Sequence, residues 1–249
     1  MTSTPRLLSI AALLALWILL SYLFPPTIIP GPVPVLGAIW ENTRSGEAFV
    51  HLSRTFLRVG LGLTLAMVLG ISVGIVMGLS RKGEAFLESW VTVGLTVPAI
   101  VYGMICLLWF GLNDFAATTA IGLTAFPAVG INMWQGVKSI DKKLVEMAQV
   151  FRLSRASIIR KIVLPQLVPY ILASLRFALG ICWKICTTVE LIGLSSGVGF
   201  MLNYWFGLFS MTQVFAWTLK FLLVMLLIEH LVFKPLEKRL LGWRPAVHV

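Results

Sequence analysis

Runs of apolar residues of membrane-spanning length limit this chain more than any other feature of its sequence. A helix needs about 20 apolar residues to cross the ~30 Å hydrocarbon core of a bilayer. The chain has about six such runs, at roughly 7–24, 56–79, 90–110, 115–135, 170–192 and 214–233. Its 249 residues are 58% hydrophobic and only 12% charged, whereas soluble domains are about 45–50% apolar and about 25% charged. We therefore expect an all-α polytopic membrane protein with about six transmembrane helices in a single transmembrane domain, 1–249.

The segments around the runs divide the expected domain into four parts. Residues 1–34 should hold an anchor span, retained because no A-x-A cleavage pattern follows its apolar core, and a proline-rich connector. Residues 35–55 have apolar positions at helical spacing beside polar ones, which favours an interfacial amphipathic segment. The core transmembrane bundle takes 56–233, including a cytoplasmic loop at 138–169, and 234–249 form a basic cytoplasmic tail.

The distribution of charge predicts how the chain is oriented. The net charge is +10, from 20 Lys+Arg and 10 Asp+Glu, which in a soluble protein would suggest nucleic-acid binding. Here the basic residues gather in a few short loops, and most of them fall on the side of the N-terminus, as the positive-inside rule requires. We therefore expect a multi-pass membrane protein with both termini in the cytoplasm and no nucleic-acid partner.

Motifs of enzymatic and cofactor sites are absent from the sequence. It contains no G-x-x-x-x-G-K-[ST] phosphate loop, no His–Glu metal motif and no nucleophile elbow. Its three cysteines, Cys106, Cys182 and Cys186, lie in apolar runs without further metal ligands nearby, and we interpret them as buried apolar residues. We expect no catalytic residue, no metal site and no cofactor bound by this chain.

Small residues recur at every fourth position of the second run. They are Gly62, Ala66, Gly70, Gly74 and Gly78. A stripe of this kind lets a second helix approach closely in lipid, so it predicts a helix-packing face. Pro98 and Pro127 lie inside the third and fourth runs, and each is expected to kink its helix. The kinks either surround a transport passage or are purely structural.

Charged residues inside the fifth run are candidates for function, because such residues are costly in a membrane helix. Lys184 lies ~20 Å from the start of this helix, too deep to reach either surface easily, and Glu190 follows on another face. We weigh two hypotheses: Lys184 faces a central passage and attracts an anionic substrate, or it forms a buried ion pair with Glu190 of a neighbouring helix or subunit. Arg176 is expected to reach the interface, as are Lys220 and Glu229. The candidate translocation path comprises Lys184, Thr187, Thr188, Glu190, Pro98 and Pro127.

The loop between the fourth and fifth runs is too polar for lipid and too regular for a random linker. Apolar residues recur at helical intervals between Asp141 and Phe151, which predicts a short amphipathic helix there. Ser154 is a favourable N-cap for a second helix, which Pro165 and Pro169 are expected to end before the fifth run. Two short helices joined at a bend form a hairpin that either docks in a partner's groove or only covers the bundle.

The same loop carries a motif that resembles a known family. Glu146-Met147-Ala148 followed by Ile162-Val163-Leu164-Pro165 is similar to the E-A-A-x3-G-x9-I-x-L-P loop of the membrane subunits of bacterial ABC importers. Trp134-Gln135-Gly136 and Gly197-Val198-Gly199-Phe200 further resemble the nitrate, sulfonate and taurine type of permease. The resemblance implies the type I importer permease fold and an ATPase-coupling loop. That loop would comprise Glu146, Met147, Ala148, Phe151, Arg152, Leu153, Ser154, Ile162, Leu164 and Pro165.

The chain departs from the family pattern at the bend of the hairpin. The family has glycine where this chain has Arg152, and glycine there suits the left-handed turn that ends a helix. A residue other than glycine in that conformation costs on the order of 1 kcal/mol. Either the bend has another geometry, or Arg152 is tolerated because it contacts the partner.

The resemblance also implies a location in the bacterial inner (plasma) membrane, a function and a set of partners. The chain would be the permease subunit of an ATP-driven importer, and would work with a second copy of itself and an extracytoplasmic solute-binding protein. Two ATPase subunits would bind ATP and Mg. The expected substrate is a small anion such as a sulfonate, taurine or nitrate, with a thiamine precursor or an aromatic acid as alternatives in the same family. The alternative of another class is a stand-alone ion-coupled carrier or channel; an intramembrane enzyme lacks a candidate active site.

Overall fold

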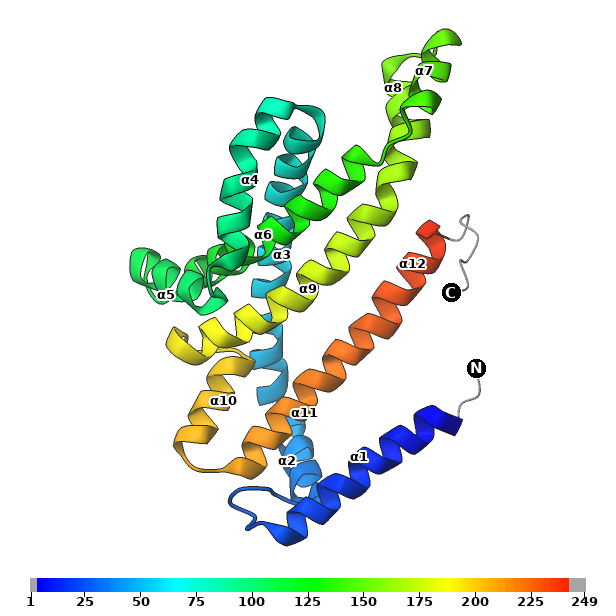
Figure 1. Cartoon of the computed structure of the whole chain (residues 1–249). Coiled ribbons are helices and arrows are strands. Elements are labelled where there is room, and N and C mark those ends of the chain that lie inside the picture. The colour runs from blue at the N-terminus through cyan, green and yellow to red at the C-terminus, as the bar shows by residue number, and fades with distance from the viewer. Residues whose placement is uncertain (1–3, 242–249) are drawn as a thin grey trace. The chain divides into compact units, whose positions relative to one another are not determined.

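The computed structural model describes residues 4–241, and every regular element in that part of the chain is helical (Figure 1). The elements are α1 (Thr4–Leu23), α2 (Pro32–Arg44), α3 (Glu47–Leu79), α4 (Arg81–Thr96), α5 (Ala99–Phe110), α6 (Asp114–Lys138), α7 (Lys142–Val150), α8 (Arg155–Ile158), the π-helical turn η1 (Ile159–Val163), α9 (Leu164–Gly193), α10 (Val198–Gly207), α11 (Met211–Ile228), the π-helical turn η2 (Glu229–Phe233) and α12 (Lys234–Leu241). The all-α prediction is confirmed. Residues 1–3 of the expected anchor and 242–249 of the expected basic tail lie outside the described residues.

The described chain contains several helices that can cross a membrane. Four stretches are long and apolar enough: Glu47–Leu79, Asp114–Lys138, Arg155–Gly193 and Met211–Leu240. Helices α4 and α5 together make a fifth, bent by 96°, and α1 contains a shorter apolar helix. Each predicted run therefore corresponds to helical structure, and the chain is a multi-pass membrane protein.

Pro98 separates two helices instead of bending one. Helix α4 ends at Thr96, and Val97 has an extended backbone with ψ of 125°, the conformation that a following proline favours. Pro98 then stands at the N-terminal cap of α5, where its missing N–H group costs no helical hydrogen bond. The predicted run 90–110 is thus a broken span and not one kinked helix. Pro127 lies buried inside α6.

Pro165 and Pro169 do not end a helix, contrary to the prediction. α8, η1 and α9 form one helical stretch, Arg155–Gly193, with Pro169 inside α9. In η1 the amide of Leu164 donates to a carbonyl five positions earlier. This wider turn leaves room for the ring of Pro165, which would clash in an ordinary α-helical turn. The same arrangement recurs where η2 precedes Pro235, so the last helix continues past its predicted end into α12.

The chain divides into two compact units. Unit 1 comprises Met1–Thr55 and Glu190–Leu226, and unit 2 comprises Phe56–Val189 and Leu227–Val249. Helices α3, α9 and α11 each contribute residues to both units. The expectation of one transmembrane domain with four parts stays a prediction.

Unit 1 has a small apolar core between α1, α2 and α11. Val35 and Ala38 of α2 pack with Ala216 of α11. The indole N–H of Trp17 in α1 donates to a backbone carbonyl of the proline-rich connector, with an N–O distance of 3.0 Å. Helix α2 thus covers part of the segment expected to be an interfacial helix, and α3 begins at Glu47, earlier than the second run predicted.

Unit 2 is organised around the close packing of α3 on α6. A Cβ atom added at Gly74 would lie 2.5 Å from the Cβ of Met133 and 2.6 Å from the carbonyl oxygen of Gly130, so only glycine fits. The residues of α6 that face Gly62, Gly70, Gly74 and Gly78 are, in that order, Ile121, Val129, Met133 and Val137. Each follows its glycine at the same separation along the chain, so the two helices run parallel in a constant register. Because α3 and α6 point the same way, α4 and α5 together must return the chain across the membrane once.

Candidate functional site: the α7–α8 hairpin and the charged face of α9

Local capping fixes where both arms of the hairpin begin. The Asp141 carboxylate accepts a hydrogen bond of 2.8 Å from the amide of Lys143 at the start of α7. The Ser154 hydroxyl oxygen accepts one of 3.3 Å from the amide of Ser157 at the start of α8. Both helices therefore begin where the sequence predicted. The side chain of Gln166 in α9 accepts a hydrogen bond of 2.9 Å from the amide of Asp141, which ties the first arm to the long helix.

The bend of the hairpin keeps the left-handed geometry despite the absence of glycine. Arg152 has φ of 54°. Its amide donates to the carbonyl of Gln149 at 2.8 Å, and the amide of Leu153 donates to the carbonyl of Ala148 at 3.0 Å. This pair of hydrogen bonds is the Schellman motif that ends many helices. Of the two explanations offered for Arg152, a different backbone geometry is therefore excluded.

The end of the hairpin presents apolar side chains to its surroundings. Val150 and Phe151 are 80% and 73% exposed, and Met147 and Leu153 are about half exposed. In Figure 1 the hairpin forms one end of unit 2. Isolated exposed apolar residues are normal, but a contiguous group of this kind marks an interaction surface. We call these four residues the hairpin tip.

The other residues of the predicted coupling loop lie along the two arms. Ala148 is buried, and so is Ile158 of the opposite arm. Exposed members of the set are Glu146, Arg152, Ser154 and Leu164, whereas Ile162 and Pro165 are partly buried.

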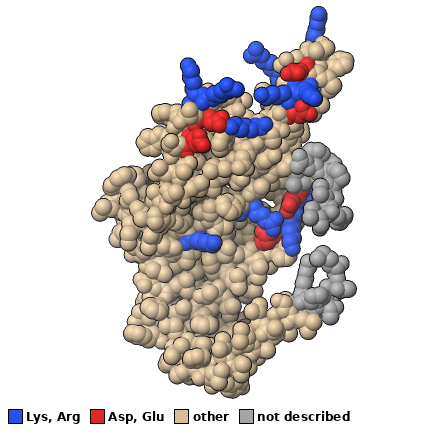
Figure 2. Space-filling view, in the orientation of Figure 1, with Lys and Arg blue, Asp and Glu red and all other residues tan. Residues whose placement is uncertain are grey.

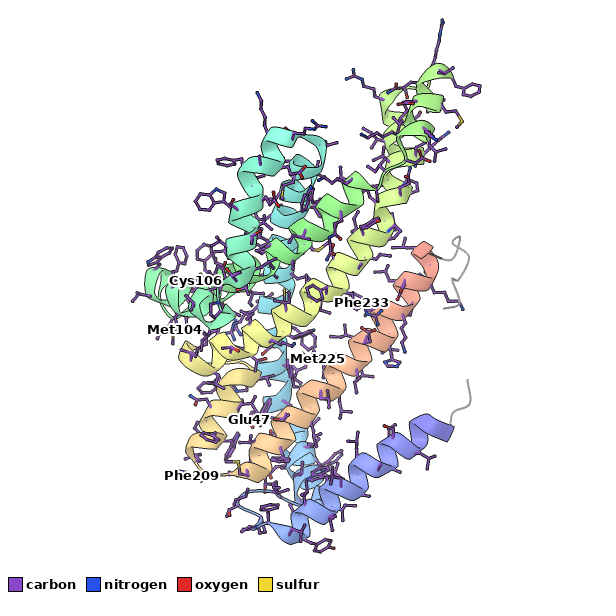
Figure 3. The ribbon with its side chains drawn as sticks, viewed as in Figure 1. Glu47, Met104, Cys106, Phe209, Met225 and Phe233 are labelled. Atoms are coloured by element: carbon purple, nitrogen blue, oxygen red, sulfur yellow. The ribbon has the colours of Figure 1, made fainter. Side chains whose placement is uncertain are left out.

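A pocket of about 660 Å³ separates α9 from η2 and α12 in unit 2. Its walls are largely apolar and include Phe177, Ile181 and Phe233, and Figure 3 labels Phe233 at the edge of this space. Lys184 lines the pocket and is exposed. Among the described residues it has no ion-pair partner.

Arg176 lines the same pocket and bridges two carboxylates. Its guanidinium group contacts Glu229 of η2 and Glu237 of α12, the latter at 3.3 Å. Figure 2 shows basic and acidic side chains gathered over this part of α9 and α12. Sequence reasoning expected Arg176 and Glu229 to reach the interface separately, and missed that they pair.

Glu190 has a different environment from Lys184. Its side chain is only 1% exposed. It accepts hydrogen bonds of 2.9 Å from the hydroxyl of Thr55 and from the amide of Gly199 in the first turn of α10. The carboxylate therefore caps the positive end of α10. The hydroxyls of Thr187 and Thr188, also predicted for the path, donate to carbonyls of α9 itself.

The sequence analysis did not predict that two cations are buried. Arg58 is 2% exposed and its guanidinium contacts the carboxylate of Asp114 at 2.6 Å, which links α3 to the start of α6. Lys220 was expected at the interface, but it is 6% exposed, with its ammonium 3.8 Å from the ring centroid of Trp217. The only signal in the sequence was their position inside apolar runs, which marks a costly charge but not its partner.

Comparison with known families gives an extended match. The family described as "Binding-protein-dependent transport system inner membrane component" matches residues 66–240. That range includes the hairpin, the glycines from Gly70 onwards and the charged face of α9.

Curated relatives are similar over most of the chain. The putative aliphatic sulfonates transport permease protein SsuC of Bacillus subtilis is 35% identical over 94% of this chain and 85% of its own length. The taurine transport system permease protein TauC of Escherichia coli is 29% identical over 96% of this chain and 89% of its own length. The nitrate import permease protein NrtB of Synechococcus elongatus is 28% identical over 80% of this chain and 75% of its own length.

A solved structure shares the fold. The inward-facing structure of the MetNI methionine ABC transporter contains a chain that matches with a TM-score of 0.66 and 15% identity, over 76% of this chain and 94% of that one. The expected type I importer permease fold is therefore confirmed, as is the resemblance drawn from the loop motif.

Proposed function

The chain belongs to the family of binding-protein-dependent transport system inner membrane components, and from this membership we propose how it works. It forms, with a second copy of itself, the membrane passage of an importer that is driven by a separate ATPase. That ATPase docks on the hairpin tip, and an extracytoplasmic binding protein delivers the substrate. The single observation that carries the proposal is the exposed apolar tip on a rigidly capped hairpin.

The geometry of the hairpin suits a mechanical contact. Its tip offers Phe151 and Val150 as anchors for a groove in a partner. Capping hydrogen bonds hold both arms, and the second arm continues through η1 into α9 as one helical stretch, Arg155–Gly193. A displacement of the tip therefore reaches the membrane part of the chain without a flexible joint between them. ATP and Mg would be bound by the partner, which would set the permease alternately open to each side.

The positive-inside rule supports a cytoplasmic position for the hairpin. α3 and α6 run parallel, so their C-terminal ends lie on the same side of the membrane. Arg81 and Lys82 follow α3, and Lys142 and Lys143 follow α6. Such clusters of basic residues next to membrane helices favour the cytoplasmic side. Both chain termini would then also be cytoplasmic.

The substrate is proposed to be a small anion. The relatives are described as permeases for sulfonates, taurine, nitrate and bicarbonate, which share a negatively charged group. Lys184 is exposed in the α9 pocket without an ion-pair partner in the described part of the chain. A cation of this kind supplies positive potential to an anion in a medium of low dielectric constant.

A substitution at the hairpin tip tests the docking. Phe151→Asp places a charge where an apolar anchor should enter the ATPase groove, and loss of such an anchor costs about 2 kcal/mol or more. We expect at least tenfold less ATPase to copurify with the permease from native membranes. The matched control is Gln149→Asp, which adds the same charge at an exposed polar residue of α7. Equal copurification with both variants would contradict the proposal.

A further inference from the structure

Two adjoining pockets lie where α3 and α6 end, next to the base of the hairpin. One has a volume of about 630 Å³ and largely apolar walls, from residues such as Ile75, Val145 and Leu167. The other has a volume of about 660 Å³ and more polar walls, contributed by the first turns of α4. Both pockets are lined by Gly78, Leu79, Val137 and Lys142. Because they share these residues, we treat them as the apolar half and the polar half of one groove, which we call the α3–α6 groove.

The polar half carries an excess of positive charge. Its basic residues are Arg81, Lys138 and Lys142, and its acidic residues are Glu84 and Glu88. Lys138 and Glu84 pair at 2.6 Å and neutralise each other. Arg81 and Lys142 have no ion pair within the described residues, and both are exposed. Outside the Lys138–Glu84 pair, the polar half therefore has two cations and one carboxylate next to the apolar half.

The ends of two candidate membrane helices place the groove near the expected level of the lipid headgroups. Two of the candidate membrane helices end there, α3 at Leu79 and α6 at Lys138. The apolar half adjoins the last turns of these helices, and the polar half adjoins the residues that follow them. Figure 2 shows Lys and Arg side chains collected over the α3–α4 turn and the hairpin at this end of unit 2. An anionic phospholipid has an apolar tail and a negatively charged headgroup. A groove that changes from apolar to basic at this boundary is complementary to both parts.

We propose that the α3–α6 groove binds an anionic phospholipid of the membrane leaflet on the hairpin side. One acyl chain occupies the apolar half, where Ile75 and Leu167 form part of the wall. The phosphate lies against Arg81 and Lys142. The tip residues Val150 and Phe151 do not line this groove, although Leu164 of the predicted coupling loop forms part of its apolar wall.

Native mass spectrometry of the full-length permease tests the proposal. The protein is purified in mild detergent and offered phosphatidylglycerol or phosphatidylcholine with identical acyl chains. We expect at least fivefold more retained phosphatidylglycerol than phosphatidylcholine. The double variant Arg81→Ala/Lys142→Ala should lose this preference. The matched control Lys82→Ala/Lys143→Ala removes the same charge from the neighbouring positions, which do not line the groove, and should keep it.

A second variant separates the two halves of the groove. Val145→Trp fills the apolar half without changing the charge, and should lower retention of phosphatidylglycerol at least fivefold. Soluble glycerol 3-phosphate should not displace the lipid, because it leaves the apolar half unfilled. Equal loss in both double variants, equal retention of phosphatidylcholine, or displacement by glycerol 3-phosphate would overturn the proposal. So would a photocrosslinker at Leu167 that captures the ATPase or a second permease in native membranes instead of lipid.

Discussion

Arg152 adopts a backbone conformation that glycine tolerates and other residues resist. Its φ of 54° costs on the order of 1 kcal/mol, which the Schellman hydrogen bonds and the apolar tip must offset. Arg152→Gly should therefore keep the hairpin and the ATPase complex and raise stability by up to about 1 kcal/mol. Arg152→Val should lower the stability of the protein, because β-branched residues are disfavoured at positive φ. Copurification and thermal unfolding measure both; loss of the complex in Arg152→Gly would show that the arginine itself contacts the partner.

Single residues also show what could be predicted from sequence. Asp141 and Ser154 could be identified as helix starts from the sequence because a helix cap is a local feature. The amide that each side chain binds lies within three positions along the chain. Phe209 adopts the same left-handed cap at the end of α10, where Figure 3 labels it, with φ of 57°. It was missed because none of the sequence motifs considered above includes that position. The hydrogen bond from Thr55 to Glu190 spans 135 positions, and no local pattern encodes so distant a partner.

At the scale of helices, the stripe of small residues on α3 has a specific partner. A larger side chain at Gly74 would overlap Met133 and the backbone of α6, whereas Gly60 on the same helix has no atom within 4 Å of an added Cβ. Gly74→Leu should destabilise the protein by about 1–3 kcal/mol or more, and Gly60→Leu should leave it nearly unchanged. Fluorescence-detected size exclusion after a heating series measures this. Similar losses for both variants would mean that α3 does not pack on α6 through this face.

Sequence patterns predicted the positions of helices more reliably than the positions where helices are interrupted. The four-residue spacing predicted a packing face, but neither its partner nor the parallel direction, since both depend on contacts between distant segments. Proline rules predicted a kink at Pro98, where the structure has a break, and a break at Pro165, where the helix continues. At Pro165 the π-turn accommodates the ring. The choice between breaking and widening a helix is made by the surrounding packing, which a proline in a sequence does not reveal.

At the scale of the whole molecule, transport should need partners. In vesicles that hold the permease alone we expect no uptake of the anion, and uptake only when ATPase, ATP and binding protein are added. Lys184→Met should then lower uptake of an alkyl sulfonate at least tenfold while ATPase binding stays normal, because the anion loses its attraction to the Lys184 ammonium. A tenfold loss corresponds to about 1.4 kcal/mol. Lys184→Arg keeps the charge and should retain most uptake. Full uptake in Lys184→Met with normal assembly would remove Lys184 from the path.

The constant register of α3 on α6 restricts which motions the permease can make. Four glycines of α3, at positions 62, 70, 74 and 78, each receive one side chain of α6, so an offset of less than a full turn, ~5.4 Å, would drive side chains into backbone. The two helices must then move together as one rigid pair at every stage of the transport cycle. Bending is left to places away from this pair and from the hairpin arm where the α-helical hydrogen-bond pattern changes, at Val97 between α4 and α5 and in η2.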